Sequence, residues 1–461
     1  MIGRRVRLAA AAGSLAIASL AVGCARASGE REAAPPASLP ELSALAKQAY
    51  VYTYPLYVMY RTRAGALRNS GNLNRFAHAR ALATPASRAV TAPNNDTLYS
   101  SAWLDLAQGP LLLHVPDTAD RYYSLAFMDF YTNNFAYVGR RTTGTQAGDF
   151  AIVGPGWQGG TPAGLPVIRA PTNAVWLLGR FLVNGDEDLP AVHALQDRLS
   201  LRPLAGVAGA APDRSRPAPE PADPWSYFTI VDEAMTENPP PERDRRVVAA
   251  MATIGVGPNA SFDAGRFTAE ERAALQSGMA AAKREIATAD APRAAGRPGW
   301  SAPRADLGNF GTDYFFRAVV AQVGLAALEP KEAVYLQPTG DADGRPLDGS
   351  HRYVLHFAKG ELPPVDAFWS LTMYQTESDQ RRFLVPNPIN RYSIGDRTKG
   401  LRYNGDGSLE IFIQHRSPGA AREANWLPAP AGPFVLSLRA YQPRPALLNG
   451  EYRVPVLQRL D

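Results

Sequence analysis

The chain has 461 residues, of which 46% are hydrophobic and 9% aromatic, and this is enough apolar material for two or three cores. The formal net charge is +5, but the positive residues are scattered among 43 acidic ones and form no basic run. The composition therefore argues against a disordered chain and against a nucleic-acid-binding protein. Forty prolines, thirty-nine glycines and nineteen tyrosines favour short strands separated by turns.

The first 24 residues have the three parts of a secretory signal. Arg4, Arg5 and Arg7 make its start positive, and an uncharged run from 8 to 23 ends in small residues. This run has about 16 residues, whereas a transmembrane helix needs about 20. We therefore predict an exported bacterial protein in the periplasm or at the outer membrane.

Cys24, at the end of this signal, is the only cysteine of the chain. The segment that it ends resembles a bacterial lipobox, in which the cysteine is lipidated and becomes the mature N-terminus, although Ala21 stands where leucine is usual. The alternative is a plain signal peptidase site at Ala25-Arg26-Ala27, which would remove Cys24. With lipidation, the protein is held to a membrane by its lipid anchor only.

The next residues predict a tether, a helix and a first β domain. Residues 25–37 have the composition of a flexible tether. Ser38 and Glu41 form a capping box for a helix whose apolar spacing stops at Pro55. From Thr97 the period becomes two, which predicts a strand over 97–106 with one buried face, followed by strands over 111–115 and 121–130. We place the helix and this β domain at 38–187.

Helical signals dominate residues 188–332, which we interpret as an α-rich insert. Asp188, Thr268 with Glu271, and Asp313 are the expected caps of three helices, and residues 202–224 form a long loop. A second β domain then covers 333–461, with strands expected at 353–357, 368–374, 409–414 and 434–441. Asn404-Gly405-Asp406-Gly407 predicts a hairpin turn.

Several longer strings carry a family resemblance. Residues 94–100 (NNDTLYS), 102–106, 121–123, 131–139 and 154–157 resemble the domain of unknown function 1254. Residues 368–374 (FWSLTMY), 390–397 (NRYSIGDR) and 425–430 resemble its usual companion, the domain of unknown function 1214, with departures at Gln375 and Tyr452. The resemblance implies an α+β, mainly β fold of two jelly-roll-like β-sandwich domains with an α-helical insert between them. It implies no settled activity.

Polar side chains gather where strands of the first β domain begin and end. Asn94, Asn95 and Asp96 precede a strand and could bind a polyhydroxylated ligand, or could instead satisfy their own backbone in an Asx-turn. Further candidates for ligand binding in this domain are Tyr99, Tyr131, Asn133, Asn134 and Arg140.

Asp129 is the candidate catalytic residue. It follows Tyr123, Leu125 and Phe127 on the same face of an apolar strand, so burial should raise its pKa toward that of a general acid. A second carboxylate, Asp96 or Asp105, would complete a pair for glycosyl or amide cleavage. The alternative is a structural acid that is paired with Arg140 or accepts backbone N–H groups.

The second β domain offers aromatic and charged candidates. Trp369, Tyr374, Arg391 and Tyr392 suit stacking on a sugar ring or binding of a carboxylate, unless they belong to the sandwich core. Asp341, Asp343 and Asp348 have the oxygen spacing of a calcium loop without the glutamate of the EF-hand pattern, so a turn is the alternative.

The six histidines are dispersed, and the chain has no motif for a transition metal, a nucleotide or a dinucleotide. We expect no metal and no cofactor. Two hypotheses remain: a noncatalytic envelope protein that binds a glycan, another small molecule, a polymer or a protein, or a carboxylate-dependent hydrolase of a glycan or amide. A homo-oligomer fits either hypothesis. A single cavity containing Asp96, Asp129, Tyr374 and Arg391 would favour the hydrolase.

Overall fold

The computed structural model describes residues 37–70, 73–204, 223–289, 293–294, 299–378 and 381–461. The predicted signal, Cys24 and almost all of the predicted tether lie outside the described residues, as does most of the loop at 202–224. Residues 39–461 form one unit. Among the helices of the described ranges, none has the length and apolar character needed to cross a membrane.

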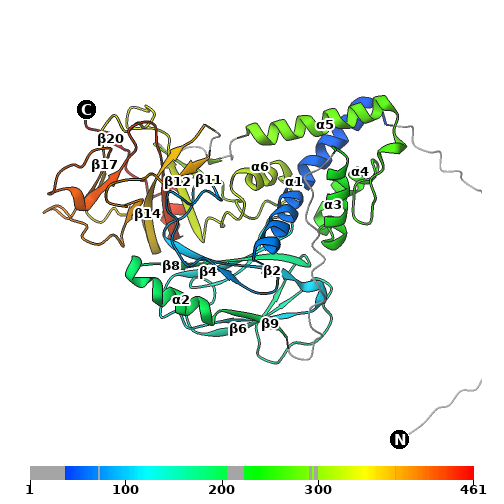
Figure 1. Ribbon diagram of the computed structural model, residues 1–461, viewed down its shortest axis with the longest axis horizontal. Helices are drawn as coiled ribbons and strands as arrows, with labels where there is room; N and C mark the ends of the chain where they lie inside the picture. Colours follow the sequence, from blue (N-terminus) through cyan, green and yellow to red (C-terminus); the bar gives the residue numbers. More distant parts are fainter. Residues whose placement is uncertain (1–36, 71–72, 205–222, 290–292, 295–298, 379–380) are drawn as a thin grey trace, which may run out of the picture. The chain divides into compact units, whose positions relative to one another are not determined.

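Two facing sheets form a first sandwich (Figure 1). One has the strand order β1 (Ala77–His78), β2 (Thr97–Asp105), β8 (Ala174–Leu182), β4 (Tyr123–Asp129), β5 (Asn134–Gly139). The other has the order β7 (Val167–Arg169), β6 (Gly148–Val153), β3 (Leu111–Val115), β9 (Ser200–Pro203). The apolar core between them includes Leu98, Leu113, Phe127, Ile152 and Leu177.

A second sandwich is built in the same way from the later part of the chain. Its larger sheet has the order β10 (Arg293–Ala294), β11 (Trp300–Pro303), β12 (Ala333–Pro338), β19 (Val435–Pro443), β14 (Val365–Thr376), β15 (Arg382–Phe383), with β16 (Ser393–Gly395) also paired to β14. Its smaller sheet has the order β18 (Trp426–Pro428), β17 (Leu409–Gln414), β13 (Tyr353–Phe357), β20 (Gln458–Arg459). Trp369, Leu371, Ile411 and Leu438 belong to the core between these sheets. The two sandwiches and the helices between them confirm the predicted fold class.

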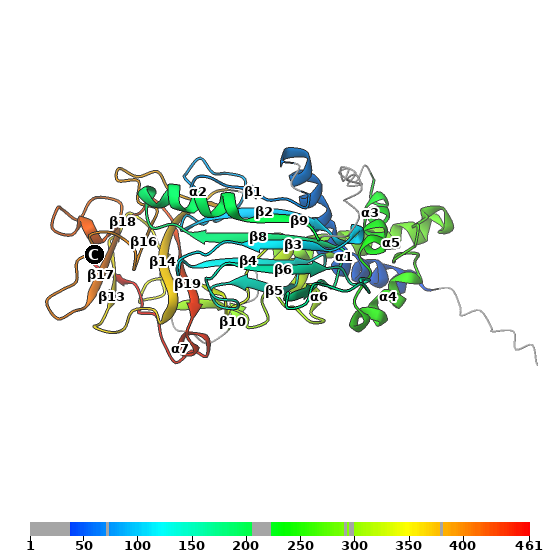
Figure 2. The same ribbon diagram turned by 90° about the horizontal axis from the view of Figure 1, so that it is seen from below.

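A helical layer covers part of the outer face of the β2–β8–β4 sheet (Figure 1). It consists of α1 (Leu39–Ser70), α3 (Ser226–Glu237), α4 (Arg245–Ala252), α5 (Ala269–Thr288) and α6 (Tyr314–Val323). The longest helix, α1, contacts the other four and shares a core with Trp103 and Met128 of the sheet. Figure 2 shows α2 (Leu189–Arg198) along an edge of the first sandwich. The remaining helical turns are α7 (Pro445–Leu448), η1 (Leu106–Gln108), η2 (Asp186–Asp188), η3 (Glu242–Asp244), η4 (Ala264–Arg266) and η5 (Glu423–Asn425).

Tertiary packing overrides three of the local predictions. α1 continues through Pro55 rather than ending there, because neighbouring helices and the sheet bury much of its surface around that residue. β2 is covered on both faces, since Trp103 packs under α1 while Leu98 faces the sandwich core. The 404–407 segment is a tight turn, but β17 pairs with β13 and β18, so the turn connects no hairpin among the described strands.

The caps were predicted with mixed success. Thr268 and Glu271 form the capping box of α5, and the Asp313 carboxylate accepts the N–H of Phe316 at the start of α6. Asp188 makes no capping hydrogen bond, because its carboxylate pairs with Arg121 and accepts the backbone N–H of Asn184 instead.

The elements also cross the domain limits that were predicted from the sequence. α1, assigned to the first β domain, packs in the helical layer. β9, assigned to the α-rich insert, pairs with β3 of the first sandwich, and β11 pairs with β12 of the second. The reason is that a strand's pairing partner can lie far away in the sequence, and local composition does not indicate which strand that partner is.

Two glycines in the helical layer test its packing. A Cβ at Gly278 of α5 would lie 2.0 Å from the Ser43 carbonyl oxygen of α1, whereas a Cβ at Gly65 of α1 would meet nothing within 4 Å. We expect Gly278→Ala to lower the free energy of unfolding by about 1–3 kcal/mol, because α1 and α5 must move apart. Gly65→Ala should raise it by about 0.5–1 kcal/mol through helix propensity. Urea unfolding measures both, and equal effects of the two substitutions would contradict this packing.

Candidate functional site

The hairpin between β4 and β5 is organised by the carboxylate of Asp129. The backbone N–H groups of Tyr131 and Asn133 each donate to Oδ1 of Asp129 at 2.9 Å. The side-chain amide of Asn133 is 3.3 Å from Oδ2. Oδ1 is therefore committed to the backbone of the turn, while Oδ2 has only this one longer contact among the described residues. Asp129 is 5% exposed.

Thr132, inside this turn, has a φ of 65°. A β-branched residue is strained in this left-handed region, and such strain persists only where the surroundings enforce it. The bonds to Asp129 provide that enforcement, because they fix the residues on either side. Strained turns of this kind are typical of ligand-binding and catalytic sites.

Two segments from the middle of the chain lie over this hairpin. The Asn133 side-chain oxygen accepts the N–H of Phe310 at 3.2 Å, and the Asn134 side chain donates to the Ala327 carbonyl at 2.8 Å. The backbone N–H of Asn134 donates to the carbonyl of Gly308 at 2.7 Å. Gly308 has a φ of +81° and leaves no room for a Cβ beside the Asn134 amide. These hydrogen bonds fix the position of the 307–310 and 326–332 segments relative to the sheet.

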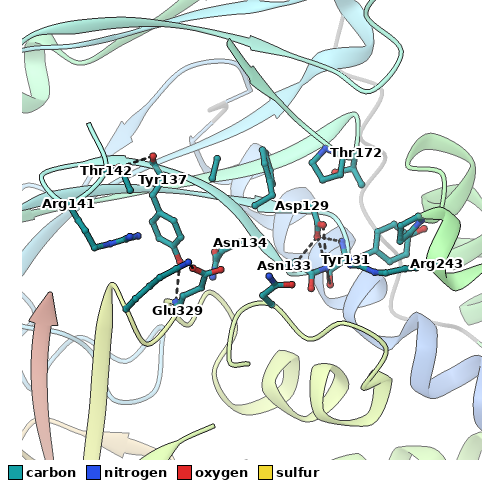
Figure 3. A pocket seen from close by; sticks show the side chains of 16 residues that line it. Asp129, Tyr131, Asn133, Asn134, Tyr137, Arg141, Thr142, Thr172, Arg243 and Glu329 are labelled. Carbon is teal, nitrogen blue, oxygen red and sulfur yellow. Dashed lines mark hydrogen bonds and ion pairs between the residues drawn. The ribbon is translucent and has the colours of Figure 1, made fainter. Parts of the chain in front are cut away.

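The space that remains is a cavity of about 570 Å³, here called the Asp129 cavity (Figure 3). Its volume is within the range of small-molecule sites. The lining combines carboxylate, amide, aromatic and cationic side chains: Asp129, Tyr131, Asn133, Asn134, Phe135, Tyr137, Arg141, Thr172, Arg243, Asn309, Glu329 and Lys331. Figure 3 shows Asp129 and Asn133 near its middle, with Arg141 and Arg243 toward opposite ends.

The cavity carries more positive than negative side chains. Arg141 pairs with the buried Glu332 at 2.5 Å and lies over the Tyr137 ring at 5.3 Å. Lys331 is 3.4 Å from Glu329, and its side chain is 63% exposed. Arg243 is 45% exposed and 3.9 Å from its nearest acid, Asp244. Lys331 and Arg243 therefore keep N–H groups that can reach an anion in the cavity.

Burial raises the pKa of Asp129, and the N–H groups of Asn133 and Tyr131 together with the charge of Arg317 oppose this rise. Arg317 is fully buried and stacks against the rings of Tyr52, Tyr131 and Tyr314 at 4.9, 5.6 and 5.2 Å. Its Nη1 is 3.9 Å from Asp244. The wall of the cavity at Tyr131 thus rests on a buried charged network contributed by three helical segments.

A second cavity of about 270 Å³, here called the Asp96 cavity, lies where the two sandwiches meet. Asp96, which is 3% exposed, accepts from Ser370 Oγ at 2.7 Å and pairs with Arg397 at 2.7 Å. Nearby, Asn95 accepts from the Ser393 hydroxyl at 2.9 Å. These bonds join the segment just before β2 to β14, to β16 and to the residues that follow β16, so Asp96 is part of the contact between the sandwiches.

Asp396 lies next to this cavity. Burial raises its pKa to about 6, the charge of Asp96 adds to the rise, and Arg397 and the Trp369 N–H oppose it. Its side chain is 30% exposed, and its Oδ1 is 3.7 Å from Arg397 Nε. Asp396 was not predicted as a site residue from the sequence. Its surroundings come from a strand 27 residues earlier and from the other sandwich, which local sequence patterns do not indicate.

The candidate residues fall into three groups. Asp129, Tyr131, Asn133 and Asn134 line the Asp129 cavity, whereas Asn95, Asp96, Arg391 and Tyr392 line the Asp96 cavity. Neither cavity includes Asn94, Tyr99, Arg140, Trp369 or Tyr374. The two proposed catalytic carboxylates therefore belong to separate cavities.

The third group and Asp105 have structural contacts. Asn94 accepts the N–H of Asp96 in an Asx-turn and donates to the Tyr441 hydroxyl. Arg140 bonds to Asp120 and Gln442 rather than to Asp129. Asp105 caps η1. Trp369 lies in the core of the second sandwich, and the Tyr374 hydroxyl donates to the Pro93 carbonyl.

The Asp341 segment is a turn. Oδ1 of Asp341 accepts the backbone N–H groups of Asp343 and Arg345, Asp343 pairs with Arg345, and Asp348 accepts the N–H of Ser350. In the part of the chain that the structure describes, no group of three or more acidic, histidine or cysteine side chains is placed to hold a metal ion.

The fold and its cavities define a two-sandwich α+β protein with a polar site beneath a helical layer. The chain belongs to the family whose tandem segments are each described as "Protein of unknown function": DUF1254 at residues 73–203 and DUF1214 at residues 332–445. Both match the predicted resemblance.

The chain is also similar to solved structures. The VPA0106 protein from Vibrio parahaemolyticus is 30% identical to this chain, with a TM-score of 0.71 over 91% of this chain and 100% of that one. An uncharacterized protein from Burkholderia cenocepacia is 13% identical, with a TM-score of 0.43 over 91% of this chain and 94% of that one. A comparison with curated proteins finds no match.

Two substitutions at Asp129 separate its structural and charged roles. Asp129→Asn keeps an oxygen for the N–H groups of Tyr131 and Asn133, so we expect the free energy of unfolding at pH 7 to stay within about 1 kcal/mol of wild type. Asp129→Ala removes the acceptor of two buried N–H groups and should cost about 1–3 kcal/mol or more.

The pH dependence provides the control for this pair. The folded-state pKa of Asp129 is above its unfolded value, so the folded protein binds the proton more tightly. Its contribution to stability is therefore present at low pH and is lost as the pH rises through the folded pKa. Denaturant unfolding between pH 4 and pH 8 should show a smaller loss in Asp129→Asn than in wild type. An unchanged pH dependence would contradict the raised pKa.

Proposed function

We propose that this protein is an exported binding protein of the cell envelope that holds a small acidic saccharide in the Asp129 cavity without converting it. The observation that carries the proposal is that Asp129, Tyr131, Asn133 and Asn134 line one cavity. Each was a candidate on sequence grounds, and the cavity has the volume and the mixed aromatic and polar lining of a small-molecule site.

The available polar atoms favour a ligand that carries hydroxyl groups. Oδ2 of Asp129 can accept a ligand hydroxyl, because the turn uses Oδ1. The Tyr137 hydroxyl accepts the Glu329 N–H at 3.1 Å, which leaves its own proton for a ligand oxygen. Phe135 and Tyr137, which are only partly buried, supply ring surface of the kind on which sugars stack.

The cationic side chains favour an acidic sugar over a neutral one. Arg243 and Lys331 are substantially exposed and only loosely paired, so a ligand carboxylate gains charge-assisted hydrogen bonds without breaking a buried ion pair. A uronic acid combines this carboxylate with the hydroxyl groups that Asp129 can accept.

The separation of the two predicted carboxylates argues against hydrolysis by that pair. Glycosidic cleavage needs two carboxyl groups within about 10 Å of each other around one bond. Asp129 is oriented by its own turn in one cavity, and Asp96 is engaged by Ser370 and Arg397 in the other. The pair named on sequence grounds therefore lacks a common space for one substrate.

Calorimetric titration with digalacturonate, and with the neutral disaccharide lactose, tests this proposal. We expect digalacturonate to bind more tightly, Asp129→Asn to weaken it about tenfold or more, and Arg243→Gln to reduce the preference for the acidic sugar. Glu270→Gln, an exposed substitution on α5, is the matched control and should bind as wild type. Equal binding by Asp129→Asn and wild type would contradict the site. Release of monosaccharide by wild type, lost in a folded Asp129→Asn protein, would instead make this an enzyme.

Export and lipidation form a separate part of the proposal. Expression in a bacterium with labelled palmitate should label the wild-type protein in the membrane fraction. Cys24→Ser should abolish the label, because no other cysteine can accept the lipid. A Ser28→Ala variant, next to the competing cleavage site, is the control and should be labelled normally. Unlabelled wild-type protein in the soluble periplasmic fraction would favour the plain signal peptidase site, and uncleaved precursor in the cytosol would contradict export.

A further inference from the structure

Two arginines are buried between the sandwiches without an acidic partner among the described residues. Arg180 of β8 and Arg439 of β19 are each 5% exposed. Charges this deeply buried are normally paired, because an uncompensated buried charge costs several kcal/mol. The charged or polar groups that act on Arg180 are tyrosines, whereas Arg439 is influenced by tyrosines and by Asp96, which forms no salt bridge with it in the described structure.

The N–H groups of the two arginines are used differently. Arg439 donates to Thr372 Oγ1 at 2.6 Å, to the Tyr374 hydroxyl at 2.5 Å and to the Ala92 carbonyl at 3.2 Å. Arg180 donates only from Nη2, to the Ala326 carbonyl at 3.1 Å. Its Nε and Nη1 are buried and have no acceptor in the described structure. Arg180 thus has donors that an external acceptor must satisfy.

The strand register places these donors in a shared polar layer. Arg180 is opposite Tyr99 on β2, and Arg439 is opposite Tyr335 on β12. The guanidinium groups lie over these rings at 5.2 and 5.7 Å. Tyr335 interacts with both arginines and with Tyr99, so the four side chains occupy one electrostatic environment where the β2–β8–β4 sheet faces β12 and β19. Tyr99 and Tyr335 are only partly buried.

Nearby carboxylates are already engaged elsewhere. Glu332 accepts from the Tyr122 hydroxyl and pairs with Arg141. Asp96 is bonded to Ser370 and Arg397. Neither can turn toward Arg180 without losing a buried bond. The two arginines therefore leave a net positive charge in a low-dielectric region, where attraction to an anion is stronger than in water.

We propose that Arg180 and Arg439, with the Tyr99 and Tyr335 rings, form a binding site for a compact oxyanion, a phosphate or a carboxylate group. The site is separate from the Asp129 cavity and does not depend on the proposed function. The free Nε and Nη1 of Arg180 donate to the anion, and the second guanidinium supplies charge. The aromatic rings fix the guanidinium planes, so little side-chain freedom is lost on binding.

Titration calorimetry with inorganic phosphate and with acetate at pH 7.5 tests the site. We expect saturable binding of at least one of these anions to wild type. The anion that binds more tightly shows whether the site prefers a tetrahedral phosphate or a planar carboxylate. Arg180→Met should keep the fold and weaken that binding about tenfold or more, because it removes charge-assisted hydrogen bonds. Without added anion it should unfold at a temperature equal to or above that of wild type, since a buried unpaired charge is gone.

Arg63→Met is the matched control. Arg63 is also buried and its Nε has no acceptor among the described residues, but its Nη2 pairs with Glu237 at 2.8 Å, so it already has a negative partner. This variant should unfold at a lower temperature and bind the anion as wild type. If Arg180→Met does not fold, Arg180→Lys, which keeps the charge with fewer donors, should bind several-fold more weakly. The proposal is wrong if neither anion binds wild type, or if binding is unchanged in a folded Arg180 variant.

Discussion

The outer face of the β2–β8–β4 sheet must be covered, and the rest of the molecule follows from how that is done. One face packs on the β3–β6 sheet, as in any sandwich. The other carries the stacked pair Trp103 and Trp176 at one end and Tyr122 and Leu182 at the other. Water cannot cover so much apolar surface at low free-energy cost. The helical layer covers the end with the two tryptophans, and the second sandwich covers the end with Tyr122 and Leu182.

The region between these two covers is where polar chemistry becomes possible. There the sheet presents Tyr99 and Arg180, while the 307–310 and 326–332 segments are held above its edge by Asn133 and Asn134. The buried donors of Arg180, the Asp129 cavity and the partly exposed rings of Tyr99 and Tyr137 all belong to this part of the molecule. Rigid packing on both sides keeps these groups in place without a ligand.

Local sequence patterns predicted what depends on neighbours along the chain. Alternation at 97–106 located β2, and Thr268 with Glu271 located the start of α5. The patterns failed where distant segments decide. Pro55 continues a helix because neighbouring elements pack around it, and Trp103 is buried by a helix that precedes it by more than 30 residues. The turn residues of the Asp129 cavity were found because a hairpin is local. Arg243, Glu329 and Lys331 were missed because only the folded chain brings them to that hairpin.

The walls of the two cavities give a reason why the family segments occur in tandem. Pro241, Arg243, Asn309, Glu329 and Lys331 lie between the two family matches and belong to neither, yet they complete the Asp129 cavity. The Asp96 cavity takes Asn95 from the first match and Arg397 from the second. A recombination event that moved only one of the two segments into another gene would transfer only part of the lining of the Asp96 cavity and no complete site. Each cavity is therefore a property of the folded chain as a whole and not of one family segment.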